Sequence, residues 1–362
     1  MEIVTNSLNP SFWKSKKVLV TGHTGFKGAW LTLWLQRLGA DVTGIGLKPE
    51  TEPNLFTCAK IEKLLKSYIC DIRDDKKIAK IVQECSPDIA FHLAAQALVR
   101  KGYRKPKSTF SINVQGTVNI LDSLRSVDNL RVVVAVTTDK VYKNIEHSYP
   151  YRETDSLGGY DPYSASKAAA EIAIACYRDS FFKEAGVSLS SVRAGNVIGG
   201  GDWAEDRLIP DAVRSWSNRF PLNIRRPDSI RPWQHVLEPL FGYMRTAEIT
   251  WDNPGLADAY NFGPETNEAA TVRQAIELAR KYYSYNAVKW AKVPEGPHEA
   301  GWLSLEIAKA RTVLGVAPRW SLDTAIEKTM TWYSNFLAGE KAGSLCYTDI
   351  EDFETSGQSN LL

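Results

Sequence analysis

A tyrosine and a lysine stand four residues apart in the segment Tyr163-Ser-Ala-Ser-Lys167. On a helix this spacing puts both side chains on one face. A free tyrosine titrates at about 10, too high for a base at neutral pH. A positive charge at about 4 Å stabilises the phenolate by about 4 kcal/mol at an effective dielectric of 20, or roughly three pKa units. The pair therefore predicts general-base chemistry.

The same spacing recurs at Tyr103 and Lys107, where Pro106 interrupts any helix. The Tyr163 pair instead opens a long Ala-rich segment after Asp161-Pro162, a typical helix start. We therefore assign catalysis to Tyr163 and Lys167, the alternative being an exposed helical Tyr–Lys pair.

A glycine-rich loop follows the apolar run 17–21 and precedes a helical pattern. Its GxxGxxG spacing allows a tight turn, close backbone approach to a diphosphate and close helix packing, while the helix N-terminus offers N–H donors. This context predicts a dinucleotide site. The residues expected to contact the cofactor here are Gly22, Thr24, Gly25, Phe26, Lys27 and Gly28.

Further cofactor contacts are expected at the ends of later strands, at Asp71, Ile72, Leu93, Ala94, Ala95 and Thr137. Asp71 either accepts from the adenine amino group or caps its strand. An acid that binds the ribose 2′-hydroxyl normally closes the second strand, but this chain has Gly44 to Lys48 there. NAD is expected and NADP is not excluded, because Lys48 would suit a 2′-phosphate.

A polar segment, Thr137-Thr138-Asp139-Lys140-Val141-Tyr142, ends the fifth predicted strand. Open α/β sheets bind ligands at this carboxyl edge, so the segment is a candidate for catalysis, the alternative being a polar turn. His92, at the end of the fourth strand, is expected in the core.

The pattern that positions these residues alternates short β-branched runs with longer amphipathic stretches, typical of a Rossmann-type doubly wound parallel sheet. Strands are expected near 17–21, 41–46, 67–71, 88–93, 131–137 and 187–194, and helices near 26–38, 75–85, 108–127 and 160–184.

The predicted domains are a dinucleotide-binding domain over 1–195, joined by a strand from about 234–262, and a smaller mixed α/β substrate lobe over 196–345. Within the lobe, helices are expected near 271–284 and 304–314. A polar tail, 346–362, is expected to be poorly ordered from about Ser344.

Composition narrows the class of partner. The formal net charge is +2, which gives no global field for nucleic acid or an anionic membrane. The N-terminal stretch has no apolar core and no later stretch approaches a membrane span, so a cytoplasmic location is expected. The scattered cysteines and histidines favour free thiols and no metal site.

Together the segments TGHTGFKG, HLAAQ, TTDKVY and YSASK resemble the extended short-chain dehydrogenase/reductase family over nearly the whole chain. TTDKVY is more similar to the nucleotide-sugar 4,6-dehydratases than to the 4-epimerases, and RAGNVIGGGDW is most similar to the branch that acts on CDP-glucose. The resemblance implies a lyase of deoxysugar biosynthesis, of the O-antigen or lipopolysaccharide type. The alternatives are an epimerase or reductase of the same fold, and a non-catalytic cofactor-sensing protein.

The resemblance also implies residue roles. Tyr163 removes the proton of the sugar 4-hydroxyl, Thr138 binds the 4-oxygen and Asp139 protonates the departing 6-hydroxyl. Related dTDP-glucose dehydratases carry a glutamate where this chain has Lys140, so Lys140 either takes the C5 proton or stabilises the enolate. The first role is our hypothesis.

Substrate binding is expected at Gln96, Asn196, Arg207, Arg231 and His298, with two arginines able to clamp a diphosphate. The family further suggests a homodimer or homotetramer formed through the helices near 108–127 and 160–184.

Overall fold

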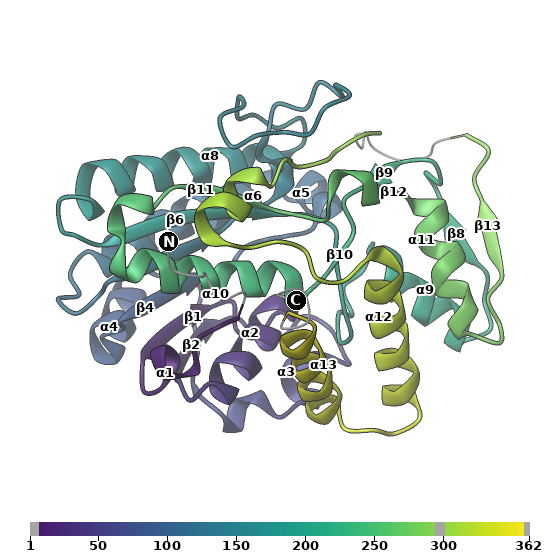
Figure 1. The fold of residues 1–362 in the computed structure, drawn as a ribbon, viewed down its shortest axis with the longest axis horizontal. Helices are drawn as coiled ribbons and strands as arrows, with labels where there is room; N and C mark the ends of the chain where they lie inside the picture. The colour runs from purple at the N-terminus through teal and green to yellow at the C-terminus, as the bar shows by residue number, and fades with distance from the viewer. Residues whose placement is uncertain (1–6, 294–300, 358–362) are drawn as a thin grey trace.

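A seven-stranded parallel sheet forms the centre of the computed structural model, which describes residues 7–293 and 301–357 (Figure 1). The strand order is β11-β6-β5-β4-β1-β2-β3. The strands are β1 (Lys17–Thr21), β2 (Asp41–Gly46), β3 (Lys66–Ile69), β4 (Ile89–His92), β5 (Val132–Val136), β6 (Ser188–Ala194) and β11 (Ala259–Phe262).

The central strands are apolar on both faces, as a sheet covered by helices on both sides requires. All five residues of β5 are buried, and β5 pairs in parallel with β4 and β6. The six predicted strands are confirmed to within two residues at each end. The seventh strand expected between 234 and 262 is confirmed as β11, which pairs with β6.

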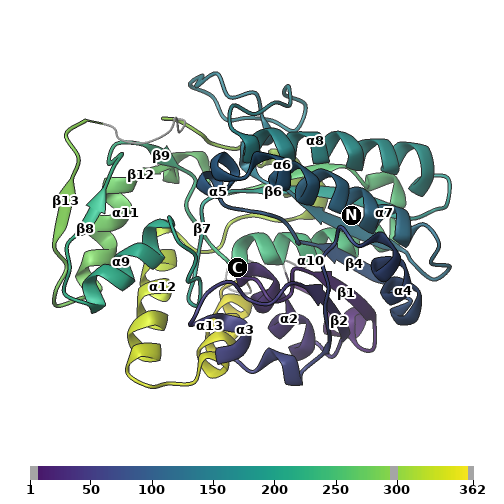
Figure 2. The ribbon, with the colours of Figure 1, turned by 180° about the vertical axis from the view of Figure 1, so that it is seen from behind.

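Helices cover both faces of the sheet. The apolar core on one face joins α2 (Phe26–Arg37) and α10 (Leu237–Asp252) to β1. The core on the opposite face joins α4 (Asp75–Cys85), α7 (Gly116–Leu124) and α8 (Pro162–Tyr177) to the sheet. Figure 2 shows α4, α7 and α8 in front of the strands. The predicted doubly wound fold is confirmed.

Shorter helical segments complete the sheet domain. They are α1 (Pro10–Trp13), α3 (Leu55–Cys58), η1 (Ile61–Lys63), α5 (Val99–Arg104), α6 (Pro106–Phe110), η2 (Ser111–Gln115), η3 (Asp139–Val141), η4 (Arg178–Phe182) and η5 (Pro254–Leu256). The single helix predicted over 108–127 is therefore wrong in detail, because a π-helical turn, η2, separates α6 from α7.

The second part is a smaller mixed α/β lobe, as predicted. Its strands pair in twos: β7 (Val197–Ile198) with β10 (Gln234–His235), β8 (Leu222–Ile224) with β13 (Val288–Trp290), and β9 (Ile230–Arg231) with β12 (Ala270–Thr271). Its helical segments are α9 (Leu208–Ser217), η6 (Thr266–Glu268), α11 (Val272–Ala279), η7 (Arg280–Tyr282) and η8 (Ala310–Leu314). The helix expected from 304 is shorter because Leu305 forms a β-bridge with Tyr151.

The expectation of a poorly ordered polar tail is wrong for the described residues, since α13 (Ala342–Ser356) is a helix packed beside α12 (Leu322–Leu337). One face of α13 buries Leu345, Ile350 and Phe353, and the Phe353 ring packs edge-on against Trp34 of α2. The polar residues that suggested disorder occupy the opposite face of an amphipathic helix.

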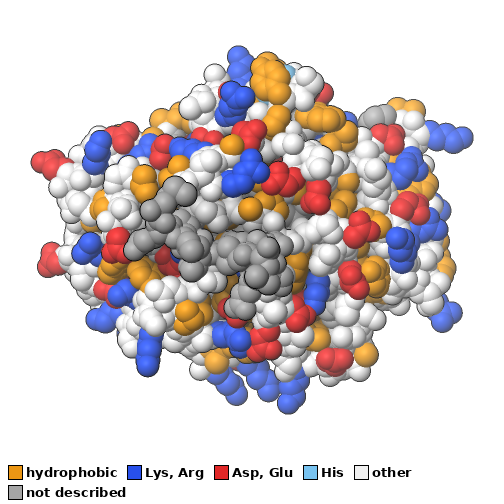
Figure 3. Space-filling view, viewed as in Figure 1, with side chains coloured by type: hydrophobic (Ala, Val, Ile, Leu, Met, Phe, Trp, Pro, Cys, Tyr) orange, Lys and Arg blue, Asp and Glu red, His pale blue; other side chains and the backbone are white. Residues whose placement is uncertain are grey.

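The surface carries both signs of charge. Basic and acidic side chains are interspersed over most of the face in Figure 3, which agrees with the formal net charge of +2. Within residues 7–293 and 301–357, no helix combines the length and apolarity needed to span a bilayer. The same part of the chain contains no group of three His, Cys, Asp or Glu side chains placed to hold a metal ion.

Candidate active site

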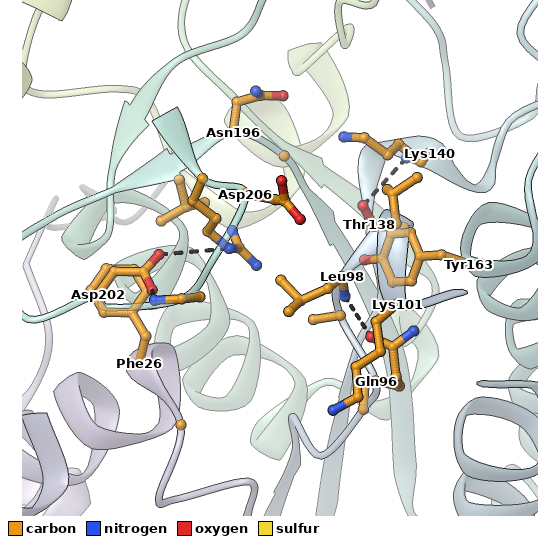
Figure 4. A pocket seen from close by; sticks show the side chains of 18 of the residues that line it. Phe26, Gln96, Leu98, Lys101, Thr138, Lys140, Tyr163, Asn196, Asp202 and Asp206 are labelled. Carbon is orange, nitrogen blue, oxygen red and sulfur yellow. Dashed lines mark hydrogen bonds and ion pairs between the residues drawn. The ribbon is translucent and has the colours of Figure 1, made fainter. Parts of the chain in front are cut away.

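A cleft of about 1660 Å³ lies at the carboxyl ends of the strands, between the sheet domain and the lobe. The glycine loop after β1 lines one part of it. The segment after β5 and the start of α8 line another, and β8 closes it from the lobe. Figure 4 shows Tyr163 and Thr138 side by side in this cleft, with Phe26 on the opposite wall. A site between these walls brings together both groups of residues that the sequence singled out.

The glycine loop is built by close backbone contacts. Gly22 has a φ of +78°, a left-handed conformation that favours glycine, and a Cβ there would lie 2.8 Å from the backbone nitrogen of Ala94. A Cβ on Gly28 would overlap the carbonyl oxygen of Gly22. Gly25 is the N-cap of α2, and no side chain caps this helix, so its first N–H groups can hold an anion. The loop fits a dinucleotide diphosphate.

Every residue predicted to bind the cofactor lines this cleft. These are Gly22, Thr24, Gly25, Phe26, Lys27, Gly28, Asp71, Ile72, Leu93, Ala94, Ala95, Thr137, Tyr163 and Lys167. Their placement along one continuous wall is what an extended dinucleotide needs, while the individual contacts stay predictions.

The end of β2 explains why the usual acid is missing. The buried ring of His23 lies under this strand, with Nε2 2.7 Å from the Ser67 hydroxyl. A Cβ on Gly46 would lie 3.2 Å from Nδ1 of His23 and 3.0 Å from the hydroxyl of Thr24. A side chain at position 46 would therefore press against His23 and Thr24. Lys48 lines the cleft just beyond Gly46.

Of the two roles considered for Asp71, the structure shows the cap, while the contact with adenine stays a prediction. Its carboxylate accepts a hydrogen bond from the backbone nitrogen of Arg73 at 2.9 Å and from the Arg73 guanidinium at 2.6 Å. The hydrogen bond from the guanidinium is the main reason that the pKa of Asp71 lies below its usual value. Asp71 thus caps its own turn while also lining the cleft.

Tyr163 lies in the first turn of α8. The Asp161 carboxylate accepts hydrogen bonds from the backbone nitrogens of Tyr163 and Ser164, at 2.9 and 3.1 Å, and Pro162 occupies the first helical position. The competing pair at Tyr103 and Lys107 falls across the break between α5 and α6, so those two side chains do not share one helix.

The predicted effect of Lys167 on Tyr163 is not found. Burial raises the pKa of Tyr163 to about 12, a hydrogen bond with Thr138 opposes the shift and the Asp139 charge adds to it. The Lys167 ammonium donates to the carbonyl oxygen of Val136 at 2.9 Å, and burial lowers the pKa of Lys167 to about 8. The estimate from spacing omitted the desolvation of both groups, which is the larger effect here.

Asp139 is fully buried behind the cleft wall. Its Oδ1 accepts hydrogen bonds from the Thr138 hydroxyl at 2.9 Å and from the Lys140 ammonium at 3.0 Å, while Oδ2 has no hydrogen-bond partner. A Cβ on Gly195 would overlap this carboxylate. Gly195 was missed by sequence reasoning, although a glycine directly after a strand signals such a close approach.

Lys27, in the first turn of α2, is half-buried and points toward α10. Its ammonium lies 3.4 Å from the Tyr243 hydroxyl of α10. Burial lowers the pKa of Lys27 to about 7, the Arg207 charge adds to this effect and the Asp139 charge opposes it. Tyr243 was also missed, because nothing in its sequence neighbourhood distinguishes it from an ordinary core tyrosine.

The predicted substrate residues Asn196, Arg207 and Arg231 line the cleft after β6 and in the lobe, whereas Gln96 lines it from the sheet domain, where its Nε2 donates to the Thr109 hydroxyl at 3.0 Å. Asn196 has a φ of +48° and its buried Oδ1 has no hydrogen-bond partner. Arg207 lies 3.6 Å from the carboxylate of Asp202. His298 lies outside the described residues.

An ion-pair cluster at the cleft was also missed. The carboxylate of Asp206 lies 3.2 Å from the guanidinium of Arg100 and 3.5 Å from that of Arg225. More than a hundred residues separate Arg100 from its partners in the sequence, so only the fold brings the three together. His92, in contrast, lies in the core as expected, with its ring nitrogens 2.7 Å from Thr21 and 3.0 Å from Thr117 hydroxyls.

A dinucleotide-type glycine loop that faces a Tyr–Lys pair on a doubly wound sheet defines the extended short-chain dehydrogenase/reductase class. Within it, the chain belongs to the family described as GDP-mannose 4,6 dehydratase, whose model matches residues 19–329.

Two relatives illustrate the range of the family. The chain is 44% identical to a CDP-glucose 4,6-dehydratase of Salmonella typhimurium over 352 residues, covering 96% of this chain and 98% of the relative. It is 27% identical to a probable dTDP-glucose 4,6-dehydratase of Sinorhizobium fredii, covering 88% of this chain and 92% of the relative.

A solved structure shares the fold. The UDP-glucose-4-epimerase of Stenotrophomonas maltophila, with bound NAD and formylated UDP-arabinopyranose, superimposes with a TM-score of 0.78 at 20% identity, covering 90% of this chain and 100% of the epimerase.

Proposed function

We propose that this chain converts CDP-D-glucose to CDP-4-dehydro-6-deoxy-D-glucose and water, with NAD as its cofactor. The observation that carries the proposal is one continuous contact: Thr138 hydrogen-bonds to both Tyr163 and Asp139, opposite the glycine loop. A base for the 4-hydroxyl and an acid for the 6-hydroxyl then act on one bound sugar. The 44% identity to a CDP-glucose 4,6-dehydratase supports the choice of substrate.

NAD held by the glycine loop between Gly22 and Gly28 would supply a hydride acceptor for C4 and, once reduced, a hydride donor for C6, so that it would not be consumed. Tyr163 takes the proton of the 4-hydroxyl. Its pKa of about 12 shows that the base needs help in this buried site. The Thr138 hydroxyl provides it when it turns its proton from Asp139 to the phenol oxygen. As the 4-ketone forms, the Thr138 hydroxyl polarises it.

The elimination follows from the acidity that the ketone gives to C5. Before the elimination, the proton of the Lys140–Asp139 pair has to pass to Asp139, which leaves Lys140 as a neutral amine. Lys140, whose side chain is 30% exposed, then takes the C5 proton in our proposal, in place of the glutamate of related dehydratases. Asp139 protonates the 6-hydroxyl as it leaves.

Substrate binding is assigned to cleft residues of both the lobe and the sheet domain. Arg231 and Arg207 supply charge for the diphosphate, and Asn196 and Gln96 supply amide groups for the phosphate and the hexose. His298 stays a prediction. Product use in deoxysugar biosynthesis of the O-antigen type, and a cytoplasmic location, are also part of the proposal.

A homodimer, or a tetramer built from dimers, is proposed through α6, α7 and α8. Apolar side chains are exposed on α6, on α8 and on η4, which continues α8: Phe110 (40%), Ile172 (62%) and Phe181 (37%). The matching apolar surface of a second copy of the chain would remove these side chains from water. Sedimentation of the Ile172→Glu variant is expected to shift toward the monomer mass. An unchanged mass would exclude this interface.

The substrate is tested by incubating the protein and NAD with a panel of nucleoside diphosphate glucoses and following the alkaline absorbance of a 4-keto sugar. We expect turnover of CDP-glucose without net NADH. NADP in place of NAD tests the cofactor in the same assay. Epimerisation without loss of water would identify an epimerase instead, and no turnover of any sugar would exclude the dehydratase.

A further inference from the structure

A buried ion pair lies directly beneath the catalytic residues. The Glu171 carboxylate of α8 accepts hydrogen bonds from Nε and Nη2 of Arg193 on β6, at 3.0 and 2.8 Å. It also accepts from the Ser191 hydroxyl at 2.7 Å and from the Thr137 hydroxyl. Both members of the pair are at most 4% exposed. Burial opposes ionisation of Glu171, yet these hydrogen bonds and the Arg193 charge hold its pKa below the usual value.

The same pair reaches the far end of the catalytic segment. Nη1 of Arg193 donates to the Tyr142 hydroxyl at 2.9 Å, and Tyr142 donates in turn to Oδ1 of Asn261 on β11 at 2.6 Å. Thr137 begins the segment that carries Thr138, Asp139 and Lys140, and Tyr142 ends it. Both ends are therefore attached to one ion pair.

Glu171 also lies one helical turn after Lys167 on α8. The pair thus joins three separate pieces of the site: the helix with Tyr163 and Lys167, the segment after β5, and β6, which leads into Gly195. A shift of the segment relative to α8 would break hydrogen bonds that no water replaces in this buried position.

We propose that Glu171 and Arg193 are positioning residues that hold the Thr137–Tyr142 segment in register with Tyr163 and Lys167. The inference rests on the proposed function for its kinetic readout, but the positioning itself is measurable without substrate.

Charges around Lys167 give the pair a second, separable effect. Glu171 raises the pKa of Lys167 against the effect of burial. The other titratable groups that face it are Lys27 of α2, His92 of β4, which burial keeps neutral with a pKa of about 3, and Tyr163 of its own helix. Removing the Glu171 charge therefore lowers the pKa of Lys167 further.

The test compares two buried carboxylates of the same kind. Glu248 of α10 is ion-paired with Arg245 at 2.7 Å and accepts hydrogen bonds from Asn9 and Trp13. The Arg245–Glu248 pair is also under 10% exposed, but it contacts no catalytic residue. Glu248→Gln is thus a matched control for Glu171→Gln, since both variants leave a buried arginine without its carboxylate.

Both variants are expected to lower Tm. Only Glu171→Gln should lower kcat, by at least tenfold, while its KM for CDP-glucose stays within twofold of wild type. The same variant should also move the alkaline limb of the plot of kcat against pH to lower pH. Hydrogen exchange of the backbone amides of 137–142 should quicken in Glu171→Gln and not in Glu248→Gln. Normal exchange, kcat and pH profile in folded Glu171→Gln would overturn the proposal.

Tyr142→Phe keeps the ring and removes only the hydroxyl that joins Arg193 to Asn261, so it serves if Glu171→Gln does not fold. We expect faster exchange over 137–142 and a severalfold loss of kcat, and wild-type values of both would overturn the proposal. If wild-type protein turns over no CDP-glucose, the proposed function fails, while the exchange measurement still decides the positioning role.

Discussion

The cofactor side and the catalytic side of the cleft are built in different ways. The glycine loop is held by backbone packing, where a Cβ on Gly22 or Gly28 would collide with neighbouring backbone. The Thr137–Tyr142 segment is held by buried side chains, with Glu171 and Arg193 at its base. Backbone geometry fixes the first wall almost independently of charge. The catalytic wall depends on the charges of its buried side chains, such as Glu171 and Arg193. Its chemistry should therefore be more sensitive than the cofactor wall to isosteric substitutions and to pH.

Tyr163→Phe should have the largest effect, because it removes the base and leaves the fold intact. We expect kcat to fall by about 10²–10⁴, with the affinity for NAD retained. Steady-state kinetics and NAD titration of the same preparation check this. Loss of NAD binding together with activity would mean that Tyr163 also holds the cofactor, so that the cofactor side and the catalytic side of the cleft do not act independently.

Lys140→Met removes the proposed C5 base while keeping a long side chain. We expect a fall of about 10² in kcat and loss of exchange of the C5 hydrogen with solvent deuterium, measured by mass spectrometry. Exchange at the wild-type rate would rule out Lys140 as the base and leave it the electrostatic role.

Gly22→Ala tests the backbone-built wall. A residue with a side chain is strained at a φ of +78°, at a cost of about 1–2 kcal/mol, and its Cβ would press on Ala94. We expect roughly tenfold weaker NAD binding with kcat at saturating NAD close to wild type. A fall in kcat with normal NAD affinity would contradict the assignment of the glycine loop to cofactor binding alone.

The pH profile tests the charge dependence of the catalytic wall. Burial lowers the pKa of Lys167 to about 8, so its ammonium is present below that pH and lost above it. The ammonium donates to the Val136 carbonyl directly before the Thr137–Tyr142 segment, and a neutral amine is a weaker donor. We therefore expect kcat to fall as pH rises through about 8. A profile flat to pH 10 would show that the Lys167 charge is not required.

Asp71→Asn should have the smallest effect. Its ion pair with Arg73 is partly exposed, and such pairs contribute about 0.2–1 kcal/mol. We expect NAD affinity to weaken by a factor of about two to five, measured by calorimetry. A loss beyond tenfold would assign Asp71 a direct contact with adenine.

Sequence patterns predicted the backbone-built parts well, because strands such as β5 and the loop Gly22–Gly28 follow from local residue types. They also brought Tyr163, Thr138 and Lys140 to one cleft. What they missed depends on long-range packing. Examples are the Lys167 hydrogen bond to Val136, the contact of Lys27 with Tyr243, the contact of Gly195 with Asp139, and the helix α13, whose Phe353 packs against Trp34 and Trp320.

The proposed cycle moves one hydrogen within one sugar, and CDP-glucose carrying deuterium at C4 tests this most directly. We expect mass spectrometry and NMR of the product to place the deuterium at C6, with no accumulation of NADH. Deuterium lost to solvent, retained at C4, or found in free NADH would contradict a closed oxidation and reduction within this cleft.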